Sequence, residues 1–297
     1  MEPAFGKPSY EPAMNQYVPK EITEEVNVTP VHPLVNLSYL IVTVLLAGAL
    51  IYGGLGLLAS QLVGRMGPKT EEKIGAALSS SLTRTLDADD SRIDYLTEMV
   101  TSLQAGESVT YPTPKIYILD TSAENAMVMA GSYLFVTEGL LAAAESENEL
   151  AFVLAHELGH LHHRDPLKAL GRSLVWISLN SILGVGQVQL PGAVATGANL
   201  SELSYGRHQE TLADDYAIAR MMARYDHGDH SLDFFKRAQA KELDLGSLNV
   251  VAEWNQTHPF SSDRIQRLES TFRANGVSLT GEATPLPDNL HCKNFSC

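Results

Sequence analysis

The sequence predicts a mainly helical α+β fold that follows a single N-terminal membrane helix. Apolar residues recur at helical spacing over several stretches of the chain, and short segments of strand-like composition lie between two of these stretches. In addition, the segment 34–63 contains no charged residue. A chain of 297 residues, of which 44% are hydrophobic, is long enough for one sizeable folded domain with appendages.

The N-terminal region divides into a polar tail and an apolar segment. The first 33 residues are rich in proline and glutamate and show no apolar periodicity, so we expect a disordered tail. The segment 34–63 then exceeds the roughly 20 apolar residues that cross a bilayer. A transmembrane anchor is therefore predicted, with a buried core helix as the alternative. A cleaved signal peptide is disfavoured, because the run is too long and the residues before it are acidic.

The charges that flank the apolar segment favour a cytoplasmic location for the residues that follow it. Arg65 and Lys69 come soon after the segment, whereas Lys20 is the one nearby base before it, and basic residues tend to stay on the cytoplasmic side. Cys292 and Cys297 would instead suit a disulfide loop in an oxidising compartment, and the sequence leaves open whether they pair. We expect a single-pass membrane protein with a cytoplasmic main domain.

A small sheet is predicted in the first half of the main domain. Helices with polar faces are expected between residues 69 and 104. Beyond them, 115–119 and 132–137 have the composition of strands, and 125–130 is a candidate third strand between the two.

The stretch 147–165 contains His156, Glu157 and His160 in the order His-Glu-x-x-His. In a helix, a spacing of four residues puts both imidazoles on one face, one turn apart, where a single zinc ion can bind both. Glu157 then lies beside the metal and can accept the proton of a zinc-bound water as a general base. Because this pattern also arises by chance, a second group of possible metal-binding residues is needed to support it.

The residues around this motif favour a helix. Ser146 and Glu149 form a capping box ahead of an apolar run of helical spacing. Asp165, which is followed by a proline, ends the helix and can cap a second one. His162 and His163 are expected at the helix end and away from the metal face, where imidazolium complements the helix dipole.

The second group of possible metal-binding residues lies downstream at 210–223, where the sequence ETLADDYAIARMMA predicts another helix. Ala213 and Ala217 give this helix a face of small residues that allows a neighbouring helix to approach. Glu210 can therefore supply a third zinc ligand. Asp214, one turn after Glu210, can hydrogen-bond the outer nitrogen of a ligand histidine and fix its tautomer.

These motifs resemble those of the HtpX-like zinc metallopeptidases, relatives of the CAAX prenyl endopeptidase and of the mitochondrial inner-membrane peptidase Oma. The residues that carry the resemblance are HELGH at 156–160, Glu-x-x-Ala-Asp at 210–214, Ser-Tyr-Gly-Arg at 204–207, and Asn125-Ala126 with Gly131 and Phe135-Val136-Thr137. The resemblance spans about residues 74–268. It implies a gluzincin fold of the zincin class, one catalytic zinc ion and endopeptidase activity. We therefore predict a metallopeptidase domain at 69–273 and a polar C-terminal tail at 274–297.

The resemblance also suggests functional roles for two segments. In proteases of this kind a strand at the edge of the cleft pairs with the substrate backbone, and the hairpin 126–136 is the candidate for it. The segment 173–200 lacks charge but is interrupted by glycines, a proline and glutamines. In some members of the family this region crosses the membrane. Here we favour a cover over the cleft, formed by 167–200, over a second membrane segment.

A His-Pro segment followed by an arginine also resembles the family. His258, near the zinc, is a candidate for stabilising the oxyanion of the attacked carbonyl, and a structural or gating role is the alternative. Arg264 is expected to pair with a carboxylate and fix its helix. The acidic and histidine residues of 226–230 are expected to be ordinary loop side chains rather than a second metal site.

The sequence therefore predicts a membrane-anchored zinc metalloendopeptidase. His156, His160 and Glu210 would hold one Zn²⁺, while Glu157, assisted by His258, would carry out catalysis. The expected partners are polypeptide substrates, unfolded chains or membrane proteins as in protein quality control, and the lipid around the anchor. The formal net charge of −14 argues against nucleic acid.

Two other classes of protein compete with this prediction. A peptide deformylase also uses His-Glu-x-x-His but needs an upstream cysteine ligand, and no cysteine precedes Cys292. The alternative that stays open is a non-catalytic zinc-binding membrane scaffold that holds unfolded chains.

Overall fold

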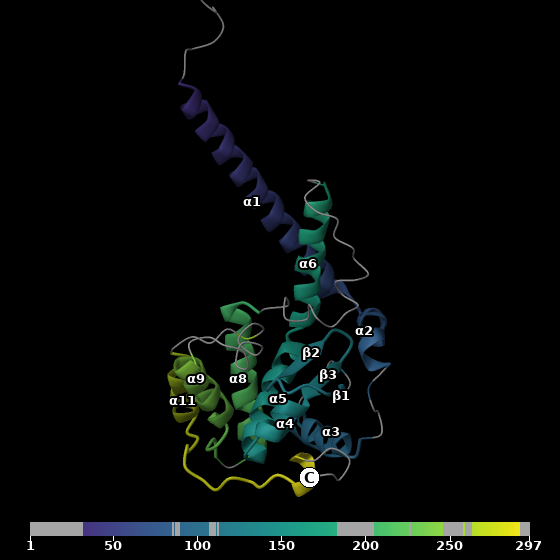
Figure 1. Ribbon diagram of the computed structural model, residues 1–297, viewed down its shortest axis with the longest axis vertical. Coiled ribbons are helices and arrows are strands. Elements are labelled where there is room, and N and C mark those ends of the chain that lie inside the picture. The colour runs from purple at the N-terminus through teal and green to yellow at the C-terminus, as the bar shows by residue number, and fades with distance from the viewer. Residues whose placement is uncertain are drawn as a thin grey trace, which may run out of the picture. The chain divides into compact units, whose positions relative to one another are not determined.

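The computed structural model describes residues 32–84, 86, 90–106, 111, 113–182, 205–225, 227–245, 258 and 263–291. The chain forms two compact units, Met1–Leu50 and Ile51–Cys297, and each is described by itself. Three predicted features lie wholly or partly outside the described residues. They are nearly all of the N-terminal tail, residues 183–200 of the cover, and both cysteines. The predicted class, a mainly helical α+β fold with an N-terminal apolar helix, is confirmed (Figure 1).

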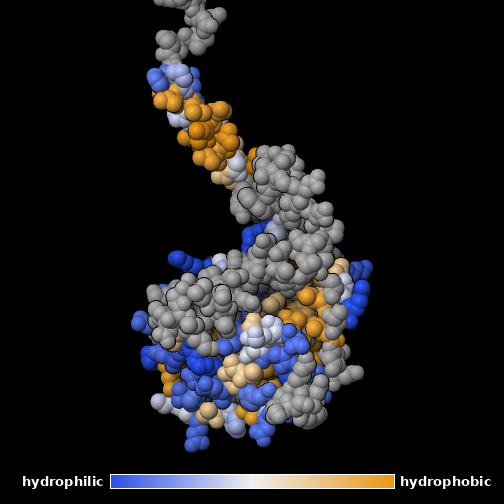
Figure 2. Space-filling model, in the orientation of Figure 1, coloured by the Kyte–Doolittle hydropathy of each residue, from blue (hydrophilic) through white to orange (hydrophobic). Residues whose placement is uncertain are grey.

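Helix α1, Pro33–Arg65, covers the predicted anchor. Among the described residues, its part Pro33–Ile51 is the one stretch long and apolar enough to cross a membrane, and none of that stretch is buried. Figure 2 shows the hydrophobic side chains of this helix on the surface of the molecule. Exposed side chains such as Leu40, Leu45 and Leu50 favour an apolar surrounding, which lipid provides.

The second unit combines a three-stranded sheet with helices. Its strands are β1 (Lys115–Leu119), β2 (Ala126–Met129) and β3 (Tyr133–Thr137). Its further described helices are α2 (Pro68–Thr83), α3 (Arg92–Leu103), α4 (Glu138–Ala143), α5 (Glu147–His162), α6 (Asp165–Ile182), α8 (Arg207–Arg224), α9 (Asp233–Leu245), α11 (Arg264–Ala274) and the 3-10 helix η2 (Asp288–His291).

The sheet contains all three of the candidate strands, in the order β1-β3-β2. Strand β1 is parallel to β3, and β2 is antiparallel to β3. The last strand begins at Tyr133 rather than at Ser132, because Gly131 and Ser132 form the hairpin turn with φ values of 84° and 62°. Such left-handed conformations are typical of tight turns between antiparallel strands.

The sheet is covered on both faces. One face packs against α5, whose residues from Asn148 to Leu161 are all buried. On the other face, Tyr117, Tyr133 and Phe135 form a stacked row that packs against apolar side chains of α2. Strand β3 is therefore buried over its whole length, and α5 is the central helix of the unit.

The predicted capping box at the start of α5 is only half formed. Ser146 Oγ accepts a hydrogen bond from the backbone N–H of Glu149 at 3.2 Å. The Glu149 carboxylate does not return this bond, because it accepts from the N–H of Glu145 and pairs with Arg237 of α9. Glu149 is fully buried, so the arginine offsets its desolvation, and this part of the prediction is wrong.

The segment predicted as a polar tail packs onto the unit as far as His291 (Figure 1, yellow). Leu290 is 1% exposed and belongs to the main hydrophobic core. Thr284 accepts a hydrogen bond from the backbone N–H of Glu147 and donates its own N–H to the Asn148 side chain, both at 2.8 Å. The segment therefore ties α11 to the start of α5.

Helices α5 and α8 make the most extensive helix contact of the described chain. A Cβ at Gly159 of α5 would lie 2.8 Å from the Cα of Ala213 on α8, so the two backbones approach closely. Ala213 and Ala217 are fully buried, as their predicted role in close packing requires. This approach brings Glu210, on the same helix, beside the histidines of α5.

Replacing Gly159 with alanine is expected to weaken both folding and metal binding. The overpacking cost of about 1–3 kcal/mol should exceed the gain in helix propensity, which is at most about 1 kcal/mol. Thermal unfolding and zinc titration measure the two effects. Gly64→Ala is the matched control, because Gly64 is also a helical glycine and a Cβ there meets nothing within 4 Å. Equal behaviour of the two variants would contradict the close approach.

Candidate active site

Helix α5 presents His156, Glu157 and His160 within one turn. The Nε2 atoms of His156 and His160 are 3.2 Å apart, and all three side chains are fully buried. The two imidazoles therefore lie on one face of the helix, as their spacing predicts.

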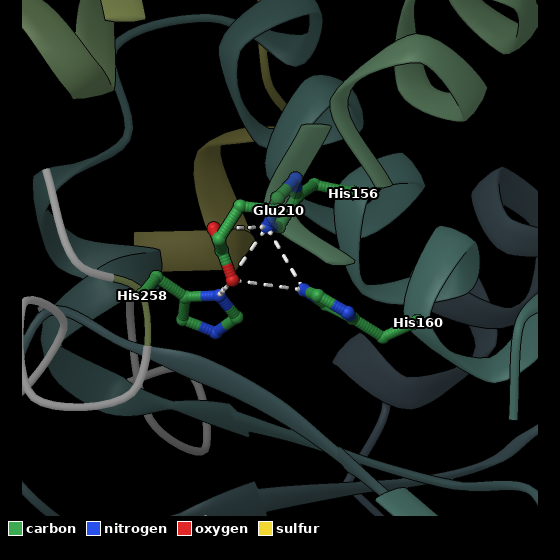
Figure 3. A group of neighbouring side chains, drawn as sticks. All are labelled: His156, His160, Glu210 and His258. Atoms are coloured by element: carbon green, nitrogen blue, oxygen red, sulfur yellow. Dashed lines mark hydrogen bonds and ion pairs between the residues drawn. The ribbon is translucent and has the colours of Figure 1, made fainter. Parts of the chain in front are cut away.

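Glu210, in the first turn of α8, faces both histidines (Figure 3). Its Oε2 lies 3.4 Å from His156 Nε2, and its Oε1 lies 3.4 Å from His160 Nε2. Burial raises the pKa of Glu210, but the charge of His258 and hydrogen bonds from the histidines lower it well below its usual range. The carboxylate is therefore ionised, which is the state that binds a metal.

His258, from the segment between α9 and α11, is the fourth member of the cluster. Its Nδ1 lies 3.1 Å from Glu210 Oε1 and 3.3 Å from His156 Nε2, and its Nε2 lies 3.2 Å from Glu157 Oε1. Ligand atoms of His156, His160, Glu210 and His258 all lie within 4.8 Å of one another. The sequence predicted His258 near the metal, but not among the possible donor atoms.

The charge of His258 depends on its surroundings. Burial lowers the pKa of His258, but the carboxylates of Glu210 and Glu157 raise it to about 9. A divalent cation among these atoms would oppose that rise, because it repels an imidazolium.

The donor set fits a divalent metal ion. Imidazole nitrogens and a carboxylate oxygen are the ligands of many catalytic zinc sites. Glu157 Oε2 is buried, and among the described residues it has no hydrogen-bond partner. Buried carboxylate oxygens are normally satisfied, so this one fits a site that also takes up a metal ion and water.

The outer nitrogens of both α5 histidines face carboxylates. Asp214 Oδ1 lies 3.0 Å from His156 Nδ1, and Asp165 Oδ2 lies 3.1 Å from His160 Nδ1. Each imidazole can therefore donate its Nδ1 hydrogen and present Nε2 to a metal. Asp214 was expected in this position from the sequence. Asp165 was interpreted only as a helix cap, and its place five residues after His160 was the available signal.

Two arginines of α11 balance the charge of Asp214. Arg264 Nη2 donates to Asp214 Oδ1 at 2.7 Å, and Arg267 pairs with the other oxygen. Arg264 Nη1 also lies 3.1 Å from Glu210 Oε2. Burial raises the pKa of Asp214, but Arg264 lowers it well below its usual range. Arg264 is thus the carboxylate partner that the sequence predicted.

Tyr205, just before α8, lies flat against His160. The two ring centroids are 3.9 Å apart and the ring planes differ by 18°, and Tyr205 is 7% exposed. The Tyr205 ring restricts the rotation of the His160 imidazole by packing on one of its faces. Asp165 holds the same imidazole through its contact with Nδ1. The sequence resemblance included Tyr205 but assigned it no role, because a stacking contact has no local signature.

Other histidines singled out in the sequence lie outside the cluster. His162 and His163 end α5 as predicted, but burial lowers the pKa of His163, so the expected imidazolium is not favoured. In the loop after α8, His230 Nδ1 lies 2.8 Å from Asp233 Oδ2, and the described residues of this loop form no metal-binding group. Asp226 lies outside the described part of the chain.

The chain is similar to known proteases. A model of Peptidase family M48 matches residues 90–272. The protease HtpX homolog of Aeropyrum pernix is 33% identical over 180 residues, which cover 46% of this chain and 54% of the relative. The protease HtpX homolog of Dictyoglomus turgidum is 30% identical over 213 residues, which cover 59% of this chain and 68% of the relative.

A eukaryotic relative is more distant. The mitochondrial metalloendopeptidase OMA1 of Schizosaccharomyces pombe is 27% identical over 157 residues, which cover 52% of this chain and 45% of the relative. The chain thus spans about half to two thirds of the length of these three relatives. The predicted resemblance is confirmed, and the matches agree with the predicted reaction class, a metallopeptidase.

Asp214→Asn is expected to weaken zinc binding roughly 10- to 100-fold, because the amide cannot hold His156 as a charged acceptor does. The dissociation constant for zinc, measured by chelator competition, tests this expectation. Asp215→Asn is the matched control, since Asp215 is the next residue on α8 and is 52% exposed. Equal zinc affinities in the two variants would contradict the proposed support of His156.

Proposed function

Because the chain belongs to peptidase family M48, we propose that it is a membrane-anchored zinc metalloendopeptidase that hydrolyses peptide bonds of protein substrates. The observation that carries the proposal is the buried cluster of His156, His160 and Glu210 beside Glu157. If these four groups were ordinary helix side chains, they would be expected on the solvated surface. Burying them together is unfavourable unless a partner replaces the hydration that each one loses.

We propose that His156 Nε2, His160 Nε2 and a Glu210 oxygen hold the metal, and that the metal is zinc. Zinc, when bound, supplies Lewis acidity that polarises a carbonyl and makes water nucleophilic near neutral pH. Asp214 and Asp165 keep the two imidazoles in the tautomer that presents Nε2.

Glu157 is proposed as the general base and later the general acid. Its carboxylate takes a proton from the attacking water and returns it to the nitrogen of the leaving amine. The free Oε2 described above supports this role, because a base must reach the proton it accepts. His258 is proposed as the second catalytic residue, donating a hydrogen bond to the carbonyl oxygen as negative charge develops there.

The position of His258 among the possible donor atoms also suits a gating role. Its Nδ1 lies close enough to the Glu210 carboxylate for both residues to bind the same metal ion. A fourth protein ligand would close a zinc site to substrate. Movement of His258 away from Glu210 would then open the site.

The substrate is proposed to be an extended polypeptide. Strand β3 is the middle strand of the sheet, so of the hairpin 126–136 only β2 is an edge strand. Since β2 also contacts α5, we propose that it pairs with the substrate backbone. Backbone pairing makes few demands on side chains, which suits unfolded or membrane proteins as substrates in quality control.

We further propose that α1 anchors the protein in a membrane as a single span, with the peptidase domain on the cytoplasmic face. The bases that follow the segment, Arg65 and Lys69, support this orientation. Labelling of Cys292 and Cys297 in sealed membranes should therefore require access from the cytoplasmic side. Labelling by an impermeant reagent from the opposite side alone would reverse the orientation.

Glu157→Gln is expected to abolish turnover while zinc is retained. Loss of a general base lowers turnover by roughly 100-fold or more. The measurement compares cleavage of casein, an unfolded protein, by detergent-purified zinc-loaded parent and variant at matched zinc content. Glu145→Gln is the control, because Glu145 is exposed and lies just before α5.

The outcomes separate the two candidate functions. Cleavage by the parent and the control but not by Glu157→Gln supports the peptidase. If parent and control bind zinc and unfolded protein without cutting it, the non-catalytic scaffold is favoured instead. Undiminished cleavage by Glu157→Gln would exclude Glu157 as the base.

A further inference from the structure

We propose that Arg164 is a positioning residue that couples the turn after α1 to the metal-binding face of α5. The inference rests on the proposed zinc site, because Arg164 is argued to act on His160 through Asp165. It concerns a group of contacts that the proposed reaction itself does not use.

Arg164 occupies an unusual place in the backbone. It lies in the turn between α5 and α6 with φ at 57°, in the left-handed region that favours glycine. Its backbone N–H bonds to Leu161 O, and its carbonyl accepts from Lys168 N, so the residue joins the end of one helix to the start of the next. This conformation is unfavourable for an arginine, so the contacts around the residue must stabilise it.

The side chain of Arg164 reaches the turn between α1 and α2. Its Nη2 donates to Glu71 Oε2 at 2.7 Å and to the carbonyl of Met66 at 2.8 Å, and its Nε donates to the same Glu71 oxygen at 3.1 Å. The guanidinium also lies over the ring of Tyr111, at 5.6 Å from its centroid. Arg164 is 16% exposed and Glu71 is 4% exposed, so water screens this pair only weakly.

The residue after Arg164 supports a proposed zinc ligand. Asp165 Oδ2 lies 3.1 Å from His160 Nδ1, and its Oδ1 accepts from Lys168 Nζ at 3.1 Å. The backbone at Arg164 therefore sets the position of a carboxylate that contacts a proposed zinc ligand.

Apolar packing joins the same elements independently of the ion pair. Val63, at the end of α1, clusters with Leu167 of α6 and with Ala130 of the hairpin turn. Met66 and Leu170 pack against this cluster. The end of the apolar helix, the turn after it and the start of α6 thus form one contact region. A displacement of the turn 66–71 would move Arg164, then Asp165, and so loosen His160.

The test uses the full chain in detergent and two readouts besides activity. Zinc affinity is measured by chelator competition, and the visible absorption of the cobalt-substituted protein reports the ligand geometry. Arg164→Gln and Glu71→Gln are each expected to weaken zinc binding roughly 10-fold or more, as loss of support around a ligand does. The double variant should lose no more than Arg164→Gln alone, because Glu71 is argued to act through Arg164.

Two further variants separate positioning from general stability. Arg164→Lys keeps the charge opposite Glu71, so it should recover part of the zinc affinity. Arg92→Gln is the matched control, because it breaks another buried pair, with Glu138, away from the cluster. It should lower the melting temperature of the zinc-free protein but leave zinc affinity and the cobalt spectrum unchanged.

Three results would contradict the inference or its premise. Parent-like zinc affinity and cobalt spectra in Arg164→Gln and Glu71→Gln would overturn the coupling while leaving the proposed peptidase intact. An equal loss of affinity in Arg92→Gln would also overturn it, by showing an effect of stability alone. A parent protein that binds no zinc would overturn the proposed function first, and the coupling with it.

Discussion

The close approach of α5 and α8 is the contact on which the candidate site depends. Gly159 lies between His156 and His160 in the sequence, and it faces Ala213, where a larger residue would push the two helices apart. Since Glu210 is one turn before Ala213 on α8, the same approach brings its carboxylate to both imidazoles. Burial of α5 on all sides, between the sheet and α8, keeps this geometry rigid.

Electrostatics adds a second constraint. Four carboxylates, those of Glu157, Asp165, Glu210 and Asp214, are buried around the histidines. Arg264 is a buried cation that contacts two of them, and it offsets part of the negative charge. A divalent ion among the donors would offset more of it, which explains why such an assembly can be stable away from water. The charge balance and the set of donor atoms thus both favour a bound divalent metal ion.

The sequence predicted those features that depend on local spacing. His156 and His160 fall on one face because of the helical period, and Ala213 marks the close face of α8. Asp165, Tyr205 and the docked segment at Leu290 were missed, because a turn geometry, a ring stack and a long-range contact leave no periodic pattern. Glu149 shows the same limit, since its carboxylate pairs with an arginine 88 residues away instead of completing the capping box.

We propose that one zinc ion binds to His156, His160 and Glu210. The most direct measurement is anomalous diffraction at the zinc absorption edge on crystals of the metal-loaded protein. We predict a single peak at about 2 Å from both Nε2 atoms and from a Glu210 oxygen. A peak at another site, or zinc-saturated protein with no peak at this cluster, would contradict the account.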